Sequence, residues 1–383
     1  MASLFQACKT VVRNQASDTL NIGGYDIGLE LYHQSDIDND AQYGNVSWGD
    51  NDESKIVVVA GDTITIPSGY TLTPDSPKKS LVLFCNNLVN NGTISMYQKA
   101  PNVLPHDYYI LESSIAGTAR NIVIPAYANN SLTDNFTYGD TTARVGNSGT
   151  NRQCGSGGLG ISGYWTGNKT SAAYGAKSGS GYAFGGGAGS GAAIGGTNGE
   201  FASDCSVDTT YPMRGGNGNR TNYDNNWSVM GGVGNPVGTT TSPKRYTNNF
   251  GCGGRIAIFC NSFTNNGIIT VNGTDAYQSI PSQALIGGPS GAGAIDIFYT
   301  NKIKEGTITA NGGNSWPTSP NIGNYASDKL NYYTSKGGNG SITLTQWTQN
   351  KIVKETIKYF SRSNVNYLLT QMAERIKDSR MGE

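Results

Sequence analysis

Residues 81–94 read Leu-Val-Leu-Phe-Cys-Asn-Asn-Leu-Val-Asn-Asn-Gly-Thr-Ile, and residues 256–269 read Ile-Ala-Ile-Phe-Cys-Asn-Ser-Phe-Thr-Asn-Asn-Gly-Ile-Ile. A looser copy at 295–308 keeps the same offset, because its glycine, Gly306, also lies eight residues after its phenylalanine. Each copy joins an apolar β run, an Asn/Gly turn and a second β run, which predicts a strand-turn-strand unit. Repetition of such a unit predicts that the copies stack, each burying a face that its neighbour supplies.

The alternation of side chains along each copy predicts which face lies in the core. One face carries Leu81, Leu83 and Cys85 in the first copy, Ile256, Ile258 and Cys260 in the second, and Ile295, Ile297 and Tyr299 in the third. We expect this face to be buried and Gly92, Gly267 and Gly306 to lie at turns. The opposite face includes Phe84, Phe259 and Phe298, and Asp296 on it indicates a face that is at least partly wet or interfacial.

The composition is that of a turn-rich β protein with a weakly charged surface. Only 14% of the 383 residues are charged, against roughly a quarter in ordinary soluble proteins, while 53 residues are Gly and 22 are Tyr. Lysine plus arginine equals aspartate plus glutamate, so the basic surplus of a nucleic-acid binder is missing. No apolar run is long enough to span a membrane. Residues 1–6 lack a charged region followed by an apolar one, so we expect no Sec signal peptide and synthesis in a cytoplasm.

The chain divides into five regions. Residues 1–54 form an N-terminal attachment segment with an amphipathic helix near residues 4–11 and an Asp-rich solvated loop at 36–40. Residues 55–100 form the first β-repeat region, in which 56–69 reads as two strands around a Gly-Asp turn. Residues 101–250 form a Gly/Tyr-rich insertion. Residues 251–346 return to the β repeat, and residues 347–383 form a C-terminal helical segment with apolar residues at helical spacing.

The insertion contains a glycine-rich stretch from 154 to 196 in which aromatic residues are interleaved. The glycines keep no strict period of three, which excludes a collagen helix, and a flexible linker has no reason to carry such rings. Because glycine lets backbones approach closely, we expect hydrogen-bonded extended or polyglycine-type segments, with a mobile loop as the alternative. The rings either fill gaps between these segments or face outward as platforms for sugars; the candidates are Tyr164, Trp165, Tyr182, Phe184 and Trp227.

The sequence contains few residues of the types that catalysis or metal binding requires. There are two histidines, and the six cysteines have no C-x-x-C pair, so we expect small buried thiols, no metal site and no cofactor. A disulfide among Cys154, Cys205 and Cys252 is possible but not needed. Asp36, Asp38 and Asp40 resemble the start of a calcium loop, but the required later Gly and Glu are replaced by Ala41 and Ser47. No pair of carboxylates is marked by its repeat position, as a glycan-cleaving enzyme would need.

The pattern of a Gly-rich lead, I-x-I-F and N-N-G at 251–273, with 287–313 and 81–96, resembles the Gly-rich β-repeat modules of bacteriophage virion proteins, namely tail fibres and tail-tip adhesins of the receptor-binding type. The stretch 185–191 is similar to the glycine-rich segments of phage adhesins, whose tip binds the host. The resemblance implies a mainly β fold of stacked, β-helix-like units with a Gly-rich insertion and a C-terminal amphipathic helix. It transfers no functional residue, because the shared motifs are structural.

Two functions remain open at this point. The first is a non-enzymatic virion surface protein, namely a tail fibre or receptor-binding component that attaches to host-surface carbohydrate. A purely structural capsid or collar appendage is a variant of this function that the sequence does not separate from it. The second is a β-helical glycan depolymerase, a hydrolase or lyase, on the same particle. In either case we expect contacts with other virion proteins and a homo-oligomer, most simply a trimer, because a β stack leaves strand edges that need covering.

Overall fold

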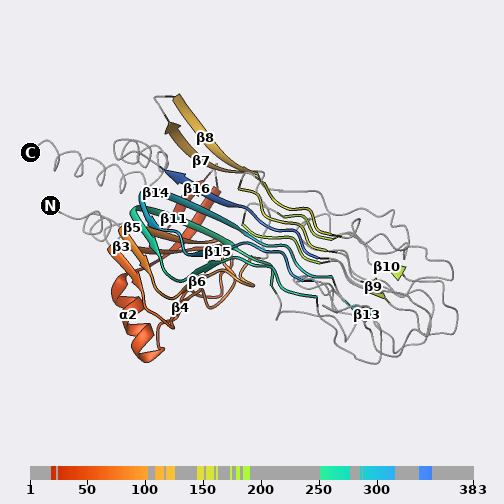
Figure 1. Ribbon diagram of the computed structural model, residues 1–383, viewed down its shortest axis with the longest axis horizontal. Coiled ribbons are helices and arrows are strands. Elements are labelled where there is room, and N and C mark those ends of the chain that lie inside the picture. The colour runs from red at the N-terminus through yellow and green to blue at the C-terminus, as the bar shows by residue number, and fades with distance from the viewer. Residues whose placement is uncertain are drawn as a thin grey trace, which may run out of the picture.

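The computed structural model describes residues 19–22, 25–101, 108–115, 118–125, 145–150, 152–158, 161–162, 173–174, 178–181, 184–189, 251–276, 285–286, 288–314 and 336–346. Strands dominate this part of the chain, helices are few, and two parallel sheets lie together at one end (Figure 1). The helix near residues 4–11 and the C-terminal helical segment 347–383, both expected from the sequence, lie outside the described residues. So does the remainder of the insertion.

Two sheets carry the repeat. In the described residues the larger sheet has the order β1 (Thr19–Ile22), β2 (Tyr25–Tyr32), β3 (Ile56–Ile66), β5 (Ser80–Asn90), β11 (Arg255–Asn265), β14 (Ala294–Lys304) and β16 (Ile342–Gln346). The smaller sheet has the order β15 (Thr307–Thr309), β12 (Ile268–Thr270), β6 (Thr93–Ser95) and β4 (Thr71–Leu72). All pairs are parallel except β1 with β2. Each repeat copy therefore contributes a long strand to one sheet and a short strand to the other.

The strand-turn-strand units predicted from the repeat are confirmed. Leu83, Ile258 and Ile297 are fully buried, and they stand opposite one another in the ladders that join β5, β11 and β14. The glycine of each copy lies between the long and the short strand. The core between the two sheets contains Val57, Val59, Leu81, Leu88, Ile94, Met96, Ile256, Phe263, Ile269, Val271 and Ile295.

The alternation of buried side chains shifts by one residue at the same position in neighbouring long strands, where asparagine side chains form a ladder. Buried positions alternate through Cys85 and then resume at Leu88, so the alternation shifts by one residue between them. At this point Asn86 donates from Nδ2 to Asp62 on β3 (2.6 Å), and Asn261 on β11 donates from Nδ2 to Asn86 (2.8 Å). The turn expected at Gly61-Asp62 is therefore wrong: β3 runs through both residues, because the Asp62 side chain continues this ladder.

The turns of neighbouring copies lock together through their asparagines and glycines. Asn90 and Asn265 are fully buried, and Asn90 Nδ2 donates to Asn265 Oδ1 at 2.7 Å. Gly92 shows why the turn position is glycine, since a Cβ there would lie 2.3 Å from the Pro67 oxygen. The Asn-Asn-Gly signature therefore fixes the spacing between copies as well as the turn within each copy.

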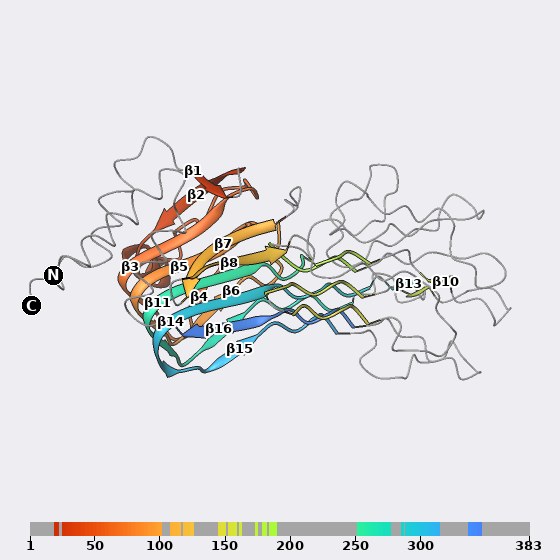
Figure 2. The same ribbon diagram turned by 90° about the horizontal axis from the view of Figure 1, so that it is seen from above.

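The β strands continue into a bundle of extended glycine-rich segments. Figures 1 and 2 show these segments running side by side away from the two sheets. A strand in a flat sheet has two neighbours, but the segment 288–293 exchanges backbone hydrogen bonds with partners all around it. Those partners are the segments 152–158, 184–189, 251–254, 271–275, 311–314 and 336–341. This is the polyglycine-type packing expected from the sequence, and it is confirmed for the described segments.

The bundle requires glycine at its contact points for steric reasons. A Cβ on Gly187 would lie 2.0 Å from the Gly179 oxygen, and a Cβ on Gly291 would lie 2.1 Å from the Gly155 oxygen. Contacts this short do not occur for real Cβ atoms, so a side chain would push the segments apart. We name the segments 145–150, 152–158, 178–181, 184–189, 251–254, 271–276, 288–293, 311–314 and 336–341 the glycine bundle.

Asparagine side chains close the outer edge of the glycine bundle. Asn311 N donates to Asn272 Oδ1 at 2.8 Å, and Gly312 N donates to Asn339 Oδ1 at 2.9 Å. Asn314 N donates to Asp275 Oδ1 at 2.6 Å in the same way. Backbone donors that have no backbone acceptor at the surface are thus paired with side chains, as buried or edge amides require.

The remaining elements lie around this frame. Helix α2 (Gln34–Tyr43) packs Ile37 against β3. Strands β7 (Tyr108–Ile115) and β8 (Thr118–Pro125) form an antiparallel pair. Strands β9 (Ile161–Ser162), β10 (Ala173–Tyr174) and β13 (Leu285–Ile286) form a small antiparallel sheet at the end of the glycine bundle that is farther from α2 (Figure 1).

The Asp-rich loop expected at 36–40 is wrong, because these residues belong to α2. Asp36 accepts from the His33 backbone N–H at 2.7 Å and so caps the helix start, while Gly44 ends the helix with a φ of 62°. The three aspartates serve different partners: Asp38 accepts from Gln34, and Asp40 accepts from Trp48 and Tyr70. They do not converge on one point.

Candidate functional site

The aromatic residues expected to bind sugars divide into two groups. Tyr164, Trp165, Tyr182 and Trp227 lie outside the described residues. Phe184 is described and is only 2% exposed, with Lys79 Nζ lying 5.5 Å from the centre of its ring. Its ring faces are therefore covered within the chain, and Phe184 follows the alternative in which a ring fills a gap between glycine-rich segments. We remove it from the set of candidate ligand contacts.

The small sheet at the end of the glycine bundle is the described part nearest in sequence to Tyr164 and Trp165. β9 ends two residues before Tyr164, and it pairs with β10 on one side and β13 on the other. Figures 1 and 2 agree that these strands lie at the far end of the bundle from the two parallel sheets. The strands that flank residues 163–172 are thus carried away from the β core by segments with almost no side chains.

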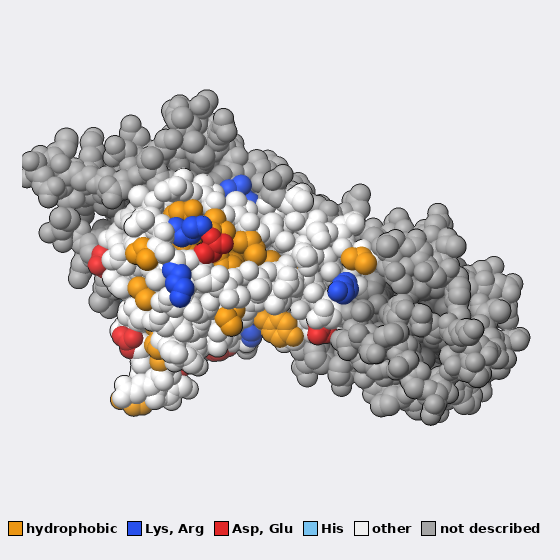
Figure 3. Space-filling view, in the orientation of Figure 1, with side chains coloured by type: hydrophobic (Ala, Val, Ile, Leu, Met, Phe, Trp, Pro, Cys, Tyr) orange, Lys and Arg blue, Asp and Glu red, His pale blue; other side chains and the backbone are white. Residues whose placement is uncertain are grey.

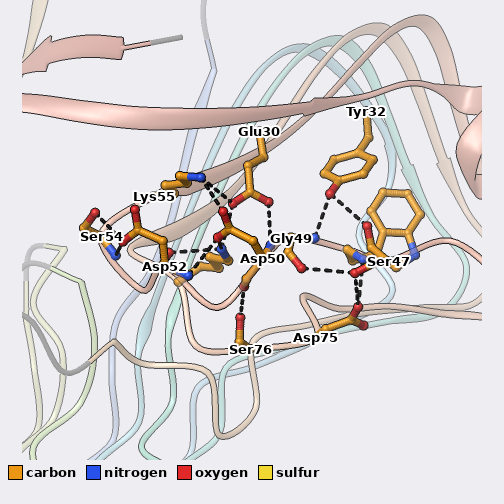
Figure 4. A network of polar contacts seen from close by, with 12 residues as sticks. Glu30, Tyr32, Ser47, Gly49, Asp50, Asp52, Ser54, Lys55, Asp75 and Ser76 are labelled. Atoms are coloured by element: carbon orange, nitrogen blue, oxygen red, sulfur yellow. Dashed lines mark hydrogen bonds and ion pairs between the residues drawn. The ribbon is translucent and has the colours of Figure 1, made fainter.

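A buried lysine organises the loop between α2 and β3 at the opposite end. The Lys78 side chain is fully buried, and its ammonium donates to Glu30 Oε1 (2.8 Å), Asp50 Oδ1 (2.9 Å) and the Asp52 carbonyl oxygen (3.0 Å). All three of its hydrogen atoms are thus used. Figure 4 shows Glu30 from β2 close to Asp50 and Asp52 from the loop between α2 and β3, with Lys55 beside them. The group closes the loop onto the sheet.

The electrostatics of this cluster are those of a structural ion pair. Hydrogen bonds from Lys55 and then Lys78 lower the pKa of Asp50 well below its ordinary value, and Asp50 in turn raises the pKa of Lys55. A carboxyl that acts as a general acid near neutral pH needs a raised pKa instead. Gly49 allows the arrangement, since a Cβ there would lie 2.7 Å from Lys78 Cε and its φ is 96°.

An aromatic group continues this cluster toward α2. Tyr32 and Trp48 lie with ring centres 4.7 Å apart, and Trp48 is 3% exposed. Trp48 Nε1 and the Tyr70 hydroxyl both donate to Asp40, at 2.8 and 2.6 Å. Partial burial acts to raise the pKa of Asp40, but the hydrogen bonds from Tyr70 and Trp48 outweigh it and the pKa is lowered. Burial and the Asp40 acceptor raise the pKa of Tyr70.

A second charged cluster lies where the glycine bundle meets the larger sheet. Asp296 on β14 is fully buried; Arg255 on β11 pairs with one of its oxygens, and Arg152 Nε lies 3.1 Å from the other. Arg152 also lies over the Phe298 ring, 5.8 Å from its centre. Asp296, which suggested a partly wet face, is itself covered by the two arginines, while the face is partly exposed elsewhere. The neighbouring rings Phe84 and Phe259 remain partly exposed.

The three phenylalanine rings of the repeat stack face to face. Phe84 and Phe259 stack with ring centres 4.6 Å apart and planes 7° apart, and Phe259 and Phe298 stack at 4.9 Å and 9°. Stacked rings of this kind stabilise the ladder by about 0.5–1.5 kcal/mol for each pair. Both faces of the central ring, Phe259, are therefore covered by its neighbours, and Phe84 and Phe298 each have one face covered in the stack.

The described cysteines are small buried side chains, as expected. Cys85, Cys154, Cys252 and Cys260 are free thiols in the interior. Burial raises the pKa of Cys154, Cys252 and Cys260 to about 12, which keeps these thiols protonated and unreactive at neutral pH. Cys154 and Cys252 are not bonded to each other, and Cys205 lies outside the described residues.

The acids of the described repeat region are all engaged in binding other groups. Asp275 accepts from Asn314, Asp296 binds two arginines, and Glu305 pairs with Lys302. Glu200, Asp204, Asp208 and Asp224, further acids from which a glycan-cleaving pair could come, lie outside the described residues.

The part of the chain that the structure describes has neither a metal-binding cluster nor a membrane-spanning helix. Within the described ranges, no group of His, Cys, Asp or Glu side chains is arranged to hold a metal ion. Among the same residues, no helix has the length and apolar character to cross a membrane. In the view of Figure 3 the described surface is mostly uncharged and polar, with small separate hydrophobic patches, in keeping with the low charge of the sequence.

No family model, curated protein sequence or solved structure matches this chain.

Sequence reasoning missed both charged clusters and the asparagine ladder. The ladder had a signal, since Asn86 and Asn261 occupy equivalent positions of the repeat. The Lys78 cluster had none, because its members are spread over the stretch 30–78 without a motif. Arg152 and Asp296 are likewise far apart in sequence and come together only when the bundle docks on the sheet.

Proposed function

We propose that this protein is a structural component of a bacteriophage virion surface, a tail fibre or receptor-binding protein that attaches to glycans on the host. Its body is a β-helix-like stack, and the glycine bundle extends that stack toward the binding end. The observation that carries the proposal is the glycine bundle: segment 288–293 is hydrogen-bonded on all sides, which makes a stiff backbone support with little side-chain chemistry of its own. Loops held by rigid scaffolds are common places for binding residues.

The proposal assigns recognition to aromatic residues beyond the bundle. Tyr164 and Trp165 follow β9 directly in the sequence, and β9 lies at the bundle end farther from α2. Aromatic faces stack on the apolar faces of sugar rings, and amide groups, abundant in this chain, hydrogen-bond sugar hydroxyls. Tyr182 and Trp227 complete the candidate set.

Binding of the purified protein to bacterial surface polysaccharides tests the assignment. The double variant Trp165→Ala/Tyr182→Ala is compared with Tyr43→Ala/Tyr97→Ala, whose rings are exposed on described parts of the body at 64% and 41%. We expect the first variant to lose at least tenfold in affinity, with an unchanged thermal melt, and the second to bind normally. Equal binding by both folded variants would show that the site lies elsewhere. Release of reducing ends from the polysaccharide would instead support the depolymerase alternative.

We also propose that the protein assembles with copies of itself, as a trimer, or with other virion proteins. The support lies at one end of the stack. Among the described residues, β16 pairs with the first half of β14, and Asn301–Lys304 are exposed. Open strand edges recruit other chains unless they are covered, and lysines such as Lys302 and Lys304 discourage uncontrolled pairing. Analytical ultracentrifugation gives the test: a well-folded protein that stays monomeric at micromolar concentration, and that contacts no other protein on purified particles, contradicts this part.

A further inference from the structure

The glycine bundle has a problem of register that its own backbone does not solve. Glycine-rich strands specify their alignment weakly, because few side chains distinguish one alignment from another. In polyglycine-type helices the structure repeats every three residues, so a slip of three residues, about 9 Å, restores the backbone orientation. A segment such as 152–158 could slip in this way and recover much of its hydrogen bonding. Some contact outside the bundle must define the correct alignment.

We propose that the buried cluster of Arg152, Asp296 and Arg255 is the register lock that aligns the glycine bundle with the β stack. Arg152 begins segment 152–158, while Arg255 and Asp296 lie near the start of β11 and β14. The lock therefore joins a bundle segment to the first residues of two repeat copies. It lies where the segments leave the bundle and become strands.

The contacts of Arg152 are specific to one alignment. Its Nε lies 3.1 Å from Asp296 Oδ1, and its terminal nitrogen donates to Thr345 Oγ1 on β16 at 3.3 Å. Its carbonyl oxygen accepts from Arg255 at 3.3 Å, and the next carbonyl, that of Gln153, accepts from Ser341 Oγ at 2.8 Å. A slip of three residues would break both contacts of the Arg152 side chain, with Asp296 and Thr345, because only one residue of the segment carries a guanidinium. The two carbonyl acceptors could be replaced by carbonyls three residues away, so the side-chain contacts carry the specificity.

Burial makes the wrong alignment costly. Asp296 is fully buried and Arg255 is 2% exposed. Arg152 Nε and Asp296 Oδ1 have no hydrogen-bond partner among the described groups, so their mutual ion pair is the compensation for their burial. A slipped segment would leave this carboxylate oxygen in the interior without that partner, and buried charges that lose a partner are strongly unfavourable.

The backbone of Arg152 supports the same reading. Its φ is 69°, a left-handed conformation that a long side chain adopts rarely. Such a conformation persists where the surrounding structure holds the residue in place. The turn before it, in which Gln153 N donates to the Thr150 carbonyl at 3.0 Å, places the side chain over β14.

The triple variant Arg152→Met/Arg255→Met/Asp296→Leu, which carries no charge at these positions, tests whether the cluster sets the alignment of the bundle segments independently of its effect on folding stability. Replacing a buried ion cluster with apolar residues of similar volume often leaves stability unchanged or raised, so loss of folding is not the expected result. Selective ¹⁵N-glycine labelling with TROSY spectra counts the environments of each bundle glycine. We expect one signal per glycine in the wild-type protein and split signals for Gly155, Gly157 and Gly187 in the variant. The matched control, Lys302→Met/Glu305→Gln, removes an exposed ion pair at the end of β14 and should keep single signals.

A single set of signals in the folded triple variant would overturn the proposal, because glycine packing alone would then set the alignment. If the triple variant fails to fold, Arg152→Lys serves instead, since it keeps the charge but loses the planar fork. We expect its bundle amides to exchange hydrogen for deuterium at least tenfold faster, with unchanged exchange in β5 and β11. Wild-type exchange rates at Gly155 and Gly157 in this variant would equally overturn the proposal.

Discussion

Replacing Gly291 with alanine should destabilise the protein severely, although alanine is the smallest possible side chain. Gly291 has no unusual backbone angle, so the penalty is purely steric. The new Cβ would lie 2.1 Å from the Gly155 oxygen and 2.5 Å from the Gly155 carbonyl carbon. Reaching an ordinary contact of 3.4 Å requires the two segments to separate by roughly 1.3 Å. Both contacting atoms are backbone, so no side-chain rotation relieves the clash.

Separating the two segments would break backbone hydrogen bonds around Gly291. Gly155 O accepts from Gly187 N at 2.9 Å, Gly291 N donates to Gly187 O at 2.8 Å, and Gly253 N donates to Gly291 O at 3.3 Å. An outward shift of the size needed would break two or three of these bonds, each costing about 1–3 kcal/mol when its groups stay buried. The expected loss of about 3–6 kcal/mol is a large part of the 5–15 kcal/mol that stabilises a typical protein. It corresponds to a fall in melting temperature on the order of 10 °C.

Thermal melting of Gly291→Ala beside Gly44→Ala provides the comparison. Gly44 has a φ of 62°, but no atom lies within 4 Å of the position that an alanine Cβ would take there, so its replacement should cost only about 1–2 kcal/mol of backbone strain. If Gly291→Ala melts at or above the temperature of Gly44→Ala, the close-packed bundle is not the source of stability argued here.

Three further predictions concern the core, the thiols and the ion cluster. Ile258→Ala should lose about 2–5 kcal/mol, because Ile258 is fully buried between neighbouring copies; a loss below about 1 kcal/mol in denaturant unfolding would contradict the stacked core. Cys260 should resist thiol reagents at pH 8 until the protein unfolds, since its thiol pKa is raised to about 12; rapid labelling of native protein by Ellman's reagent would refute this. Asp50 has a lowered pKa in the folded state, so its stabilisation is present above its ordinary pKa of 3.8 and is lost as the pH falls below it. Asp50→Asn should therefore be less stable at pH 7 and less sensitive to pH between 4 and 2, and parallel stability curves for variant and wild type would exclude the ion pair.

The repeat predicted the β stack because local and long-range information coincide there. Leu83, Ile258 and Ile297 are apolar at the same point of each copy, and stacking places equivalent residues opposite one another. The sequence pattern did not predict the shift in the alternation of buried residues, which lies where Asn86 donates to Asp62 in a different strand. The same bond turned an expected Gly-Asp turn into continuous strand.

Other features depend on contacts that no local pattern records. Asp36 and Asp40 look like loop residues by composition, but one caps α2 and the other accepts from Trp48 and Tyr70. Phe184 looks like an outward ring between glycines, yet Lys79 covers it. Asp36 acts through the neighbouring His33, but for Asp40 and Phe184 the deciding partners come from different segments, so the sequence pattern could supply the residue type but not its environment.

The glycine bundle and the β stack should respond differently to temperature. Unfolding of the stack exposes hydrocarbon, which raises the heat capacity, while unfolding of the bundle exposes mainly peptide groups, which lower it. The stack around Ile258 therefore loses part of its stabilisation on cooling, as hydrophobic cores do. The bundle around Gly291, held by backbone hydrogen bonds, has a flatter dependence. On cooling, the glycine bundle should therefore keep its stability while the β stack loses part of its own.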